Sequence, residues 1–128
     1  MRVLKTKAFS QWAKKLKISD AILLTAINEM QYGLYEANLG DYIYKKRLAL
    51  GHKGKSAGAR TIIAFKSGDK AFFIYGFSKS EKSNISQKEE DALKDLAKIY
   101  FNYDEEQLKK AIKAGILIEV RPNEKVHS

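Results

Sequence analysis

The middle of the chain, residues 42–78, constrains the fold most strongly. Three segments in it are rich in aromatic and β-branched residues, as strands are. These segments are 42–48, 61–66 and 71–78. A glycine-rich basic loop follows the first segment, and the turn signal Ser67-Gly68-Asp69 follows the second. Consecutive strands with such short connections pair as an antiparallel sheet, which needs a covered inner face.

Helical patterns lie on both sides of this sheet. Apolar residues between Phe9 and Leu16 follow helical spacing, and Ser19 is an N-cap candidate for a second helix that Gly33 would end. A turn at 17–19 would join the two helices in an antiparallel pair. After the sheet, two capping-box patterns begin further helices, and Gly115 would end the last of them. The capping boxes are Ser86 with Glu89 and Asp104 with Gln107.

These patterns predict a single α+β domain over residues 1–128. Two N-terminal helices would pack on a mainly antiparallel sheet of about four strands, and C-terminal helices would follow. Arg2–Lys5 would be a short opening strand, and 116–120 a short strand or an ordered tail.

The chain has no cysteine, which excludes disulfides and thiolate metal sites. The N-terminus is basic but has no apolar core of a secretory signal, and no uncharged stretch is long enough to span a bilayer. We therefore expect a cytoplasmic protein. The two histidines, His52 and His127, are 75 positions apart and neither lies in a ligand motif, so no metal or other cofactor is expected.

Charge is the strongest compositional signal. Lys and Arg outnumber Asp and Glu by 24 to 15, and residues 1–82 hold 16 basic and 6 acidic residues. Between Asp41 and Asp69 there are seven basic residues and no acidic one. Such a stretch indicates a polyanionic partner, most often a phosphate backbone, although a merely solvated basic face has the same composition.

Several enzyme classes lack their motifs. The segment Gly51-His52-Lys53-Gly54-Lys55-Ser56 ends like a P-loop, but its glycines are too close together and it lies between two antiparallel strands. No G-x-S-x-G is present. The adjacent acids Asp104, Glu105 and Glu106 suit the start of a helix better than a catalytic site.

The basic residues of the predicted strands form the candidate site. Lys45 and Arg47 project from one face of a strand because side chains alternate. Arg60 opens the next strand, and Lys79 and Lys82 follow the third, so the three strands could bring these cations together. The polar outer face of a half-exposed sheet would give the same pattern. Aromatic residues at strand spacing could stack on exposed bases, but most of them are expected in the core.

The order of these segments resembles the HigB-like branch of the RelE toxin superfamily. The resemblance covers about residues 2–100 and leaves a C-terminal extension of about 102–128. It rests on short runs at matching spacing. The runs are Gly40-Asp41-Tyr42-Ile43-Tyr44-Lys45-Lys46-Arg47-Leu48, Gly54-Lys55-Ser56-Ala57-Gly58-Ala59-Arg60, Phe72-Phe73-Ile74-Tyr75-Gly76-Phe77-Ser78-Lys79 and Asn84-Ile85.

The resemblance implies the toxin of a type II toxin–antitoxin system, inhibited by an antitoxin that a neighbouring gene encodes and that is expected to be a helix-turn-helix protein. It implies a metal-independent endoribonuclease in which the ribose 2′-OH attacks the adjacent phosphodiester of mRNA in the ribosomal A site. Lys45, Arg47, Arg60 and Lys79 match the family's basic catalytic positions. Other cations would bind RNA. These are Lys46, Lys53, Lys55 and Lys82.

Roles follow from where charge develops. Arg60 and Lys79 would stabilise the phosphorane, Arg47 would orient the phosphate, and Lys45 would be the general base if neighbouring cations depress its pKa. Some ribonucleases of the superfamily carry a tyrosine where this chain has Ser86, so Tyr75 or His52 could replace it. Two other functions stay open: a gyrase-inhibiting toxin of the ParE type, and a non-catalytic nucleic-acid-binding module.

Overall fold

The structure is a computed structural model that describes residues 1–50 and 58–122. The helices are α1 (Lys7–Lys15), α2 (Asp20–Gln31), α3 (Gln87–Phe101) and α4 (Glu105–Lys113). The strands are β1 (Arg2–Thr6), β2 (Ala37–Gly40), β3 (Ile43–Arg47), β4 (Ala59–Phe65), β5 (Lys70–Ser78) and β6 (Leu117–Glu119). No helix of these two ranges is long and apolar enough to cross a membrane.

The helix boundaries follow the capping residues. Ser19 caps α2 by accepting a hydrogen bond from the Ile22 amide, and the connection after α2 passes through Gly33 at φ +79°. Both predicted capping boxes are present, at Ser86 before α3 and at Asp104 before α4. The sequence therefore predicted the starts of α2, α3 and α4 correctly, whereas the Thr6 N-cap that begins α1 was not predicted.

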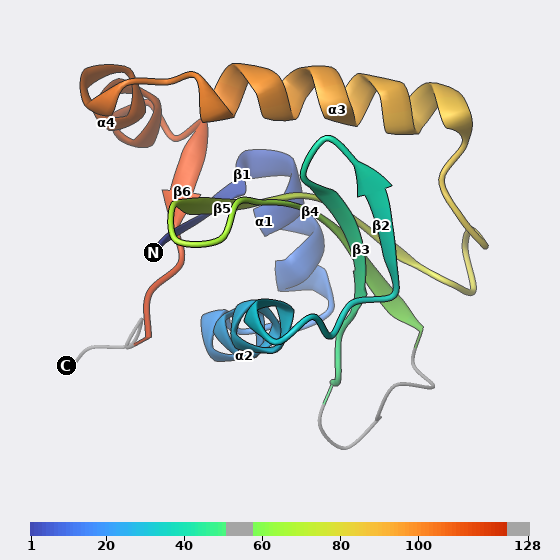
Figure 1. Cartoon of the computed structure of the whole chain (residues 1–128). Coiled ribbons are helices and arrows are strands. Elements are labelled where there is room, and N and C mark those ends of the chain that lie inside the picture. Colours follow the sequence, from blue (N-terminus) through green and yellow to red (C-terminus); the bar gives the residue numbers. More distant parts are fainter. Residues whose placement is uncertain (51–57, 123–128) are drawn as a thin grey trace, which may run out of the picture.

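Within the described residues the sheet has six strands, in the order β2-β3-β4-β5-β1-β6 (Figure 1). Its pairs are antiparallel except β1 and β5, which run parallel because α1 and the following elements separate them in sequence. The predicted strands and the 67–69 hairpin turn are confirmed within a few residues. The expected count of about four strands was too low. β2 was missed because Ala37-Asn38-Leu39-Gly40 has no β-branched or aromatic residue.

Helices cover both faces of the sheet, and Figure 1 shows α3 and α4 on one side and α1 and α2 on the other. The sequence named only the N-terminal helices as cover and left a half-exposed sheet open as an alternative; that alternative is wrong, because α3 and α4 cover the second face. All seven residues of β4 are buried. The α1 side packs closely at Gly76, where a Cβ atom would lie 2.3 Å from Trp12 Cε3.

The C-terminal segment is integrated into this fold. β6 pairs with β1, and Leu108 of α4 and Leu117 of β6 are fully buried in the core on the α3 side. Asp20 joins the ends of the chain, since its carboxylate accepts bonds from Lys5 Nζ at 2.7 Å and from the Arg121 amide at 3.0 Å. α4 and β6 thus complete the sheet and its cover.

Candidate active site

Strand register arranges the α3 face of β3, β4 and β5 in three rows. Directly paired residues of an antiparallel sheet point to the same face, and alternate pairs share it. The first row is apolar, the second is mixed and the third is basic. In order they are Ile43–Ala64–Phe72, Lys45–Ile62–Tyr75 and Arg47–Arg60–Phe77. The predicted shared face of Lys45 and Arg47 is therefore present, and Arg60 joins them on it.

Arg60 is the most constrained cation of the site. Its side chain is only 7% exposed, and its Nε lies 2.9 Å from the Glu36 carboxylate. Its Nη1 is buried and has no hydrogen-bond partner among the described residues. The exposed Arg47 stands directly opposite on β3. Two opposed arginines repel each other, and the Glu36 carboxylate offsets part of that repulsion. The Arg60 guanidinium is thus fixed at one edge, with donor capacity left on another.

Lys45 and Lys79 border this basic row. Lys45 Nζ donates to Asn84 Oδ1 at 3.1 Å, which places the segment leading into α3 beside the second row. Lys79 follows β5, is exposed, and its backbone N–H donates to the Gly58 carbonyl at 2.8 Å. The carbonyl of Gly58 thereby holds Lys79 at the end of β4 that carries Arg60. The structure brings all four predicted catalytic residues to one end of the sheet.

Lys82 is part of a polar group at the start of α3. Its ammonium pairs with Glu89 and donates to the Tyr75 hydroxyl at 3.2 Å. The hydrogen bond to Glu89 is the main reason that the pKa of Lys82 is raised, and the same bond lowers the pKa of Glu89. Lys82 therefore stays charged, and it connects β5 to the first turn of α3.

Lys46 is not brought to this site. It points to the opposite face of β3, where its Nζ lies 2.7 Å from the Glu29 carboxylate of α2 and its side chain is 8% exposed. Its ammonium is accordingly turned away from Lys45, which it was expected to influence. Three other predicted residues, His52, Lys53 and Lys55, lie outside the described residues.

Two acidic residues from outside the acid-free stretch 42–68 form ion pairs with basic residues inside it. Glu29 pairs with Lys46 and Glu36 pairs with Arg60. Neither acidic partner was predicted, nor was Asn84, because these contacts depend on the packing of α2 against β3, on the chain before β2 and on the segment before α3. The acid-free appearance of residues 42–68 is therefore a property of the sequence and not of the surface.

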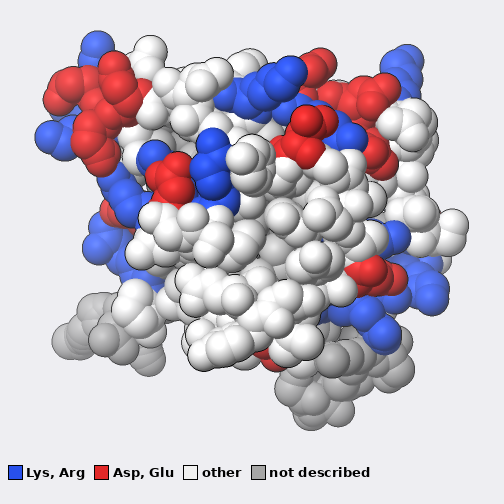
Figure 2. Space-filling view, in the orientation of Figure 1, with Lys and Arg blue, Asp and Glu red and all other residues white. Residues whose placement is uncertain are grey.

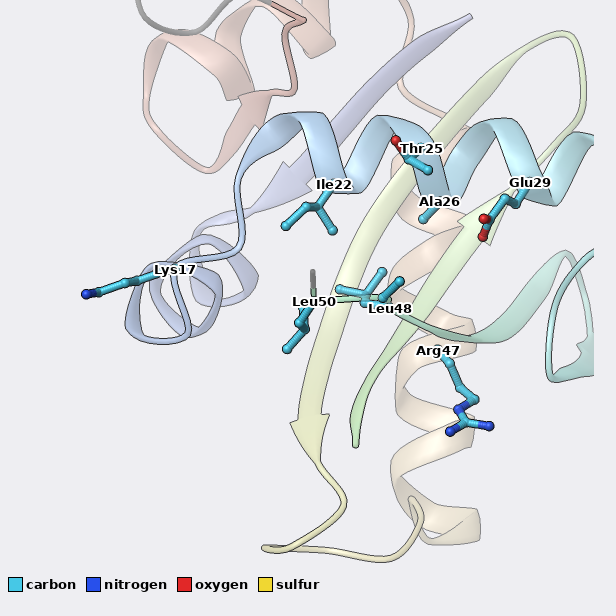
Figure 3. Close-up of a pocket in the computed structure, with 9 residues that line it drawn as sticks. Lys17, Ile22, Thr25, Ala26, Glu29, Arg47, Leu48 and Leu50 are labelled. Carbon is cyan, nitrogen blue, oxygen red and sulfur yellow. The ribbon is translucent and has the colours of Figure 1, made fainter. Parts of the chain in front are cut away.

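The basic region lies next to an area of the surface that carries few charges. Figure 2 shows Lys and Arg side chains gathered near the ends of β3 and β4, beside a broad uncharged area over α2 and the β2–β3 hairpin. A pocket of about 470 Å³ lies between α2 and the segment after β3. Figure 3 shows Ile22 and Ala26 of α2 facing Leu48 and Leu50 there, while Arg47 extends away from α2. Its lining combines these apolar side chains with charged and polar ones, namely Lys17, Thr25, Glu29 and Arg47.

No group of three or more His, Cys, Asp or Glu side chains that could hold a metal ion exists in residues 1–50 and 58–122. The cations gathered at the site are guanidinium and ammonium groups, and the side chains beside them include the Asn84 amide and the Tyr75 hydroxyl. Such groups bind phosphate oxygens and stabilise negative charge that develops on them.

Comparison with known proteins identifies the family. A family model described as the RelE toxin of the RelE / RelB toxin-antitoxin system matches residues 1–120. The chain belongs to the RelE toxin family. It is thus the toxin of a toxin–antitoxin system, with an antitoxin as its partner. The match extends through α4 and β6, past the 2–100 segment on which the sequence resemblance rested. No curated protein and no solved structure matches this chain.

Proposed function

We propose that this RelE toxin is a metal-independent endoribonuclease that cleaves mRNA in the ribosomal A site through attack of the ribose 2′-OH. Ribonuclease activity is general among toxins of the family. The observation that carries the proposal is the Arg47–Arg60 pair, in which a buried guanidinium keeps a donor nitrogen without a partner among the described residues. A buried donor of this kind costs stability, and a phosphate oxygen would satisfy it. We also assign the toxin to the HigB-like branch, on the sequence runs that resemble it.

The arginines divide the work by their exposure. Arg47 is exposed and can grip a phosphate with its planar fork. Arg60 is held through Nε by Glu36, so its orientation is set before substrate arrives. A preorganised cation stabilises the phosphorane more than the ground state because the transition state carries more negative charge. Lys79, at the same end of the sheet, adds an exposed positive charge to this group.

Proton transfer requires two groups on this face. Lys45 is our candidate to accept the 2′-OH proton, since its Nζ is positioned by Asn84 and it lies in the same row as Tyr75, with Ile62 between them. The Tyr75 oxygen accepts a hydrogen bond from Lys82, which leaves its O–H proton free to be donated toward the leaving 5′-oxygen. Tyr75→Phe should then slow cleavage while leaving RNA affinity near that of the wild type.

The test measures single-turnover cleavage of mRNA on saturating programmed ribosomes beside ribosome affinity. Arg60→Ala should lower the cleavage rate by on the order of 10²–10³ and weaken affinity only modestly. Arg60→Lys is the matched control, because it keeps the charge opposite Glu36 and loses the planar fork; it should retain the wild-type fold and an intermediate rate. Lys53→Ala and Lys55→Ala should instead weaken binding with nearly normal saturated rates.

Two results would contradict this assignment. If Arg60→Ala lowers affinity alone and saturated cleavage is unchanged, Arg60 is a binding residue. If the wild type stops DNA replication in growing cells while translation continues, the toxin acts as a gyrase inhibitor of the ParE type. Arrest of translation with mRNA cut at A-site codons is the expected outcome.

The antitoxin should meet the basic end of the sheet. We propose a helix-turn-helix antitoxin that a neighbouring gene encodes and that covers Arg47 and Lys79 with an acidic or apolar segment, since both side chains are exposed. Such a segment would inhibit by occupying the place of the phosphate. We further propose that toxin and antitoxin meet in the cytoplasm, where mRNA and ribosomes are.

A further inference from the structure

A second hollow borders the basic row at the edge of the sheet. Pairing between β2 and β3 ends at Ala37 and Lys45, and the Glu36 amide donates to the Lys45 carbonyl at 2.8 Å. Beyond this point β3 forms the edge of the sheet. A shallow pocket of about 320 Å³ occupies the space. Its lining is Leu34, Tyr35, Glu36, Lys46 and Arg47.

Tyr35 gives this pocket a fixed aromatic wall. Its ring centroid lies 4.8 Å from that of Tyr44, tilted by 57°, so the ring is braced on one side. The residue is nevertheless 40% exposed. An exposed ring that a neighbour holds in place can stack on a planar ligand at little entropic cost, since its rotamer is already restricted.

Charge at the pocket is of both signs. The basic residues Lys46 and Arg47 line it together with Glu36, whose side chain is 33% exposed. A carboxylate offers about four acceptor positions, and the ion pair with Arg60 Nε uses one of them. The pocket therefore offers a stacking surface, an acceptor and a nearby cation.

We propose that this pocket binds one base of the RNA substrate, stacked on Tyr35, and that Glu36 selects guanine. The proposal rests on the endoribonuclease function proposed above and names the specificity determinant of that site. Guanine presents two adjacent donors, N1–H and the N2 amino group, to a single carboxylate. Uracil presents one N–H between two carbonyl oxygens, which the carboxylate repels. Guanine should be preferred most strongly over uracil.

The arrangement couples recognition of the base to catalysis. Glu36 contacts Arg60, whose guanidinium is proposed to stabilise the phosphorane. A base bound by Glu36 therefore shares this carboxylate with Arg60. Arg47 lines the pocket and also stands opposite Arg60 in the basic row. A nucleotide whose base fills the pocket would thus bring its own phosphate to Arg47. The correct base would place the scissile bond, and a wrong base would leave it out of position.

RNA fits this pocket better than a protein segment does. The rim next to the basic row is cationic, as phosphate requires, and Figure 2 shows the Lys and Arg side chains adjoining the uncharged area over the β2–β3 hairpin. The pocket is also shallow and opens at a strand edge, which suits a splayed-out base.

The experiment measures single-turnover cleavage on programmed ribosomes whose A-site codon carries each of the four bases in turn at each position. The wild type should prefer guanine over uracil at one position by about 10-fold or more. Tyr35→Leu keeps an apolar contact with Tyr44 but removes the plane that holds the base against Glu36. The rate should therefore fall for every base, and the preference for guanine should fall to within about 3-fold. Tyr35→Phe should keep it. Tyr32→Leu is the matched control, since Tyr32 is 77% exposed in the same connection and does not line the pocket.

Glu36→Gln decides the base assignment independently and also serves if Tyr35→Leu does not fold. It should remove the advantage of guanine and lower the rate for all bases, because Arg60 loses its partner. The inference is overturned if the wild type cleaves without base preference, or if Tyr35→Leu and Glu36→Gln keep the wild-type preference. It is also overturned if Tyr35→Leu weakens only antitoxin binding, which would make the pocket a protein-docking surface. A wild type that cuts no RNA would instead refute the proposed function.

Discussion

Lys46 and Arg47 are adjacent on β3, but substitution of Lys46 should mainly lower stability, whereas substitution of Arg47 should mainly weaken RNA binding. Lys46 is 8% exposed and pairs with Glu29 across to α2, whereas Arg47 is exposed on the other face. Lys46→Met keeps the length of the side chain and removes its charge. Loss of one partner of a buried pair can cost about 3–5 kcal/mol, but Glu29 is 40% exposed and can rehydrate. We therefore expect a loss of about 1–2 kcal/mol in the free energy of unfolding, or about 4–8 °C in Tm.

The same pair should separate stability from RNA binding. Lys46→Met should change the salt dependence of RNA affinity less than Arg47→Ala does, because the Lys46 ammonium is paired with Glu29 even though the residue lines the pocket beside Tyr35. Arg47→Ala should leave Tm within about 2 °C and reduce the slope of log K against log[salt] by about 0.7, the value for one contact to a single-stranded phosphate. Thermal unfolding and RNA binding at several salt concentrations measure both quantities. If Lys46→Met reduces the slope of log K against log[salt] as much as Arg47→Ala does, Lys46 contacts RNA phosphates. The reasoning that its pairing with Glu29 keeps it from the RNA would then be wrong.

Three further predictions follow from particular contacts. Antitoxin association should slow markedly as salt rises from low to physiological concentration, because the exposed cations of the site attract it; a rate that is flat with salt would exclude steering by charge. Gly76→Ala should destabilise the protein by about 1–3 kcal/mol, since its Cβ would lie 2.3 Å from Trp12, and a smaller residue at position 12 should relieve part of this loss in urea unfolding. The hydrogen bond from Lys82 lowers the pKa of Glu89, so this group stabilises the fold above its ordinary pKa of 4.5 and ceases to do so as pH falls through the lower folded value. The difference in Tm between wild type and Lys82→Met should accordingly narrow below about pH 4.5, and a constant difference down to pH 2 would contradict the linkage.

Most of the helices and strands could be predicted from short sequence patterns that involve neighbouring residues. The capping boxes at Ser86 and Asp104 satisfy backbone donors within a few residues, so they can be recognised without tertiary information. β2 could not be recognised in this way. Its residues have little preference for strands, and it forms because it pairs with β3 next to Glu36.

The candidate site likewise has features that local patterns predicted and features that depend on contacts between distant segments. Alternation along β3 predicted that Lys45 and Arg47 share a face, and register with β4 then added Arg60. Alternation also implied that Lys46 faces the other way, but its role depended on Glu29 of α2, which is 17 positions away. Burial of Arg60 beside Glu36 was beyond prediction because it requires the β2 edge, a contact between segments that no local pattern joins.

In the mechanism that we propose, the ribose 2′-OH is the nucleophile and the protein's cations stabilise the resulting phosphorane. The most direct measurement follows cleavage by the purified wild-type toxin of programmed ribosomes whose mRNA carries a single 2′-deoxy nucleotide at the cleaved position, with the all-ribose mRNA beside it and a chelator in both reactions. The account predicts that the all-ribose mRNA is cut to a 2′,3′-cyclic phosphate and a 5′-hydroxyl, and that the 2′-deoxy substitution abolishes cleavage at that bond while ribosome binding is unchanged. Cleavage of the 2′-deoxy mRNA at the same bond, or products that carry a 5′-phosphate, would contradict it.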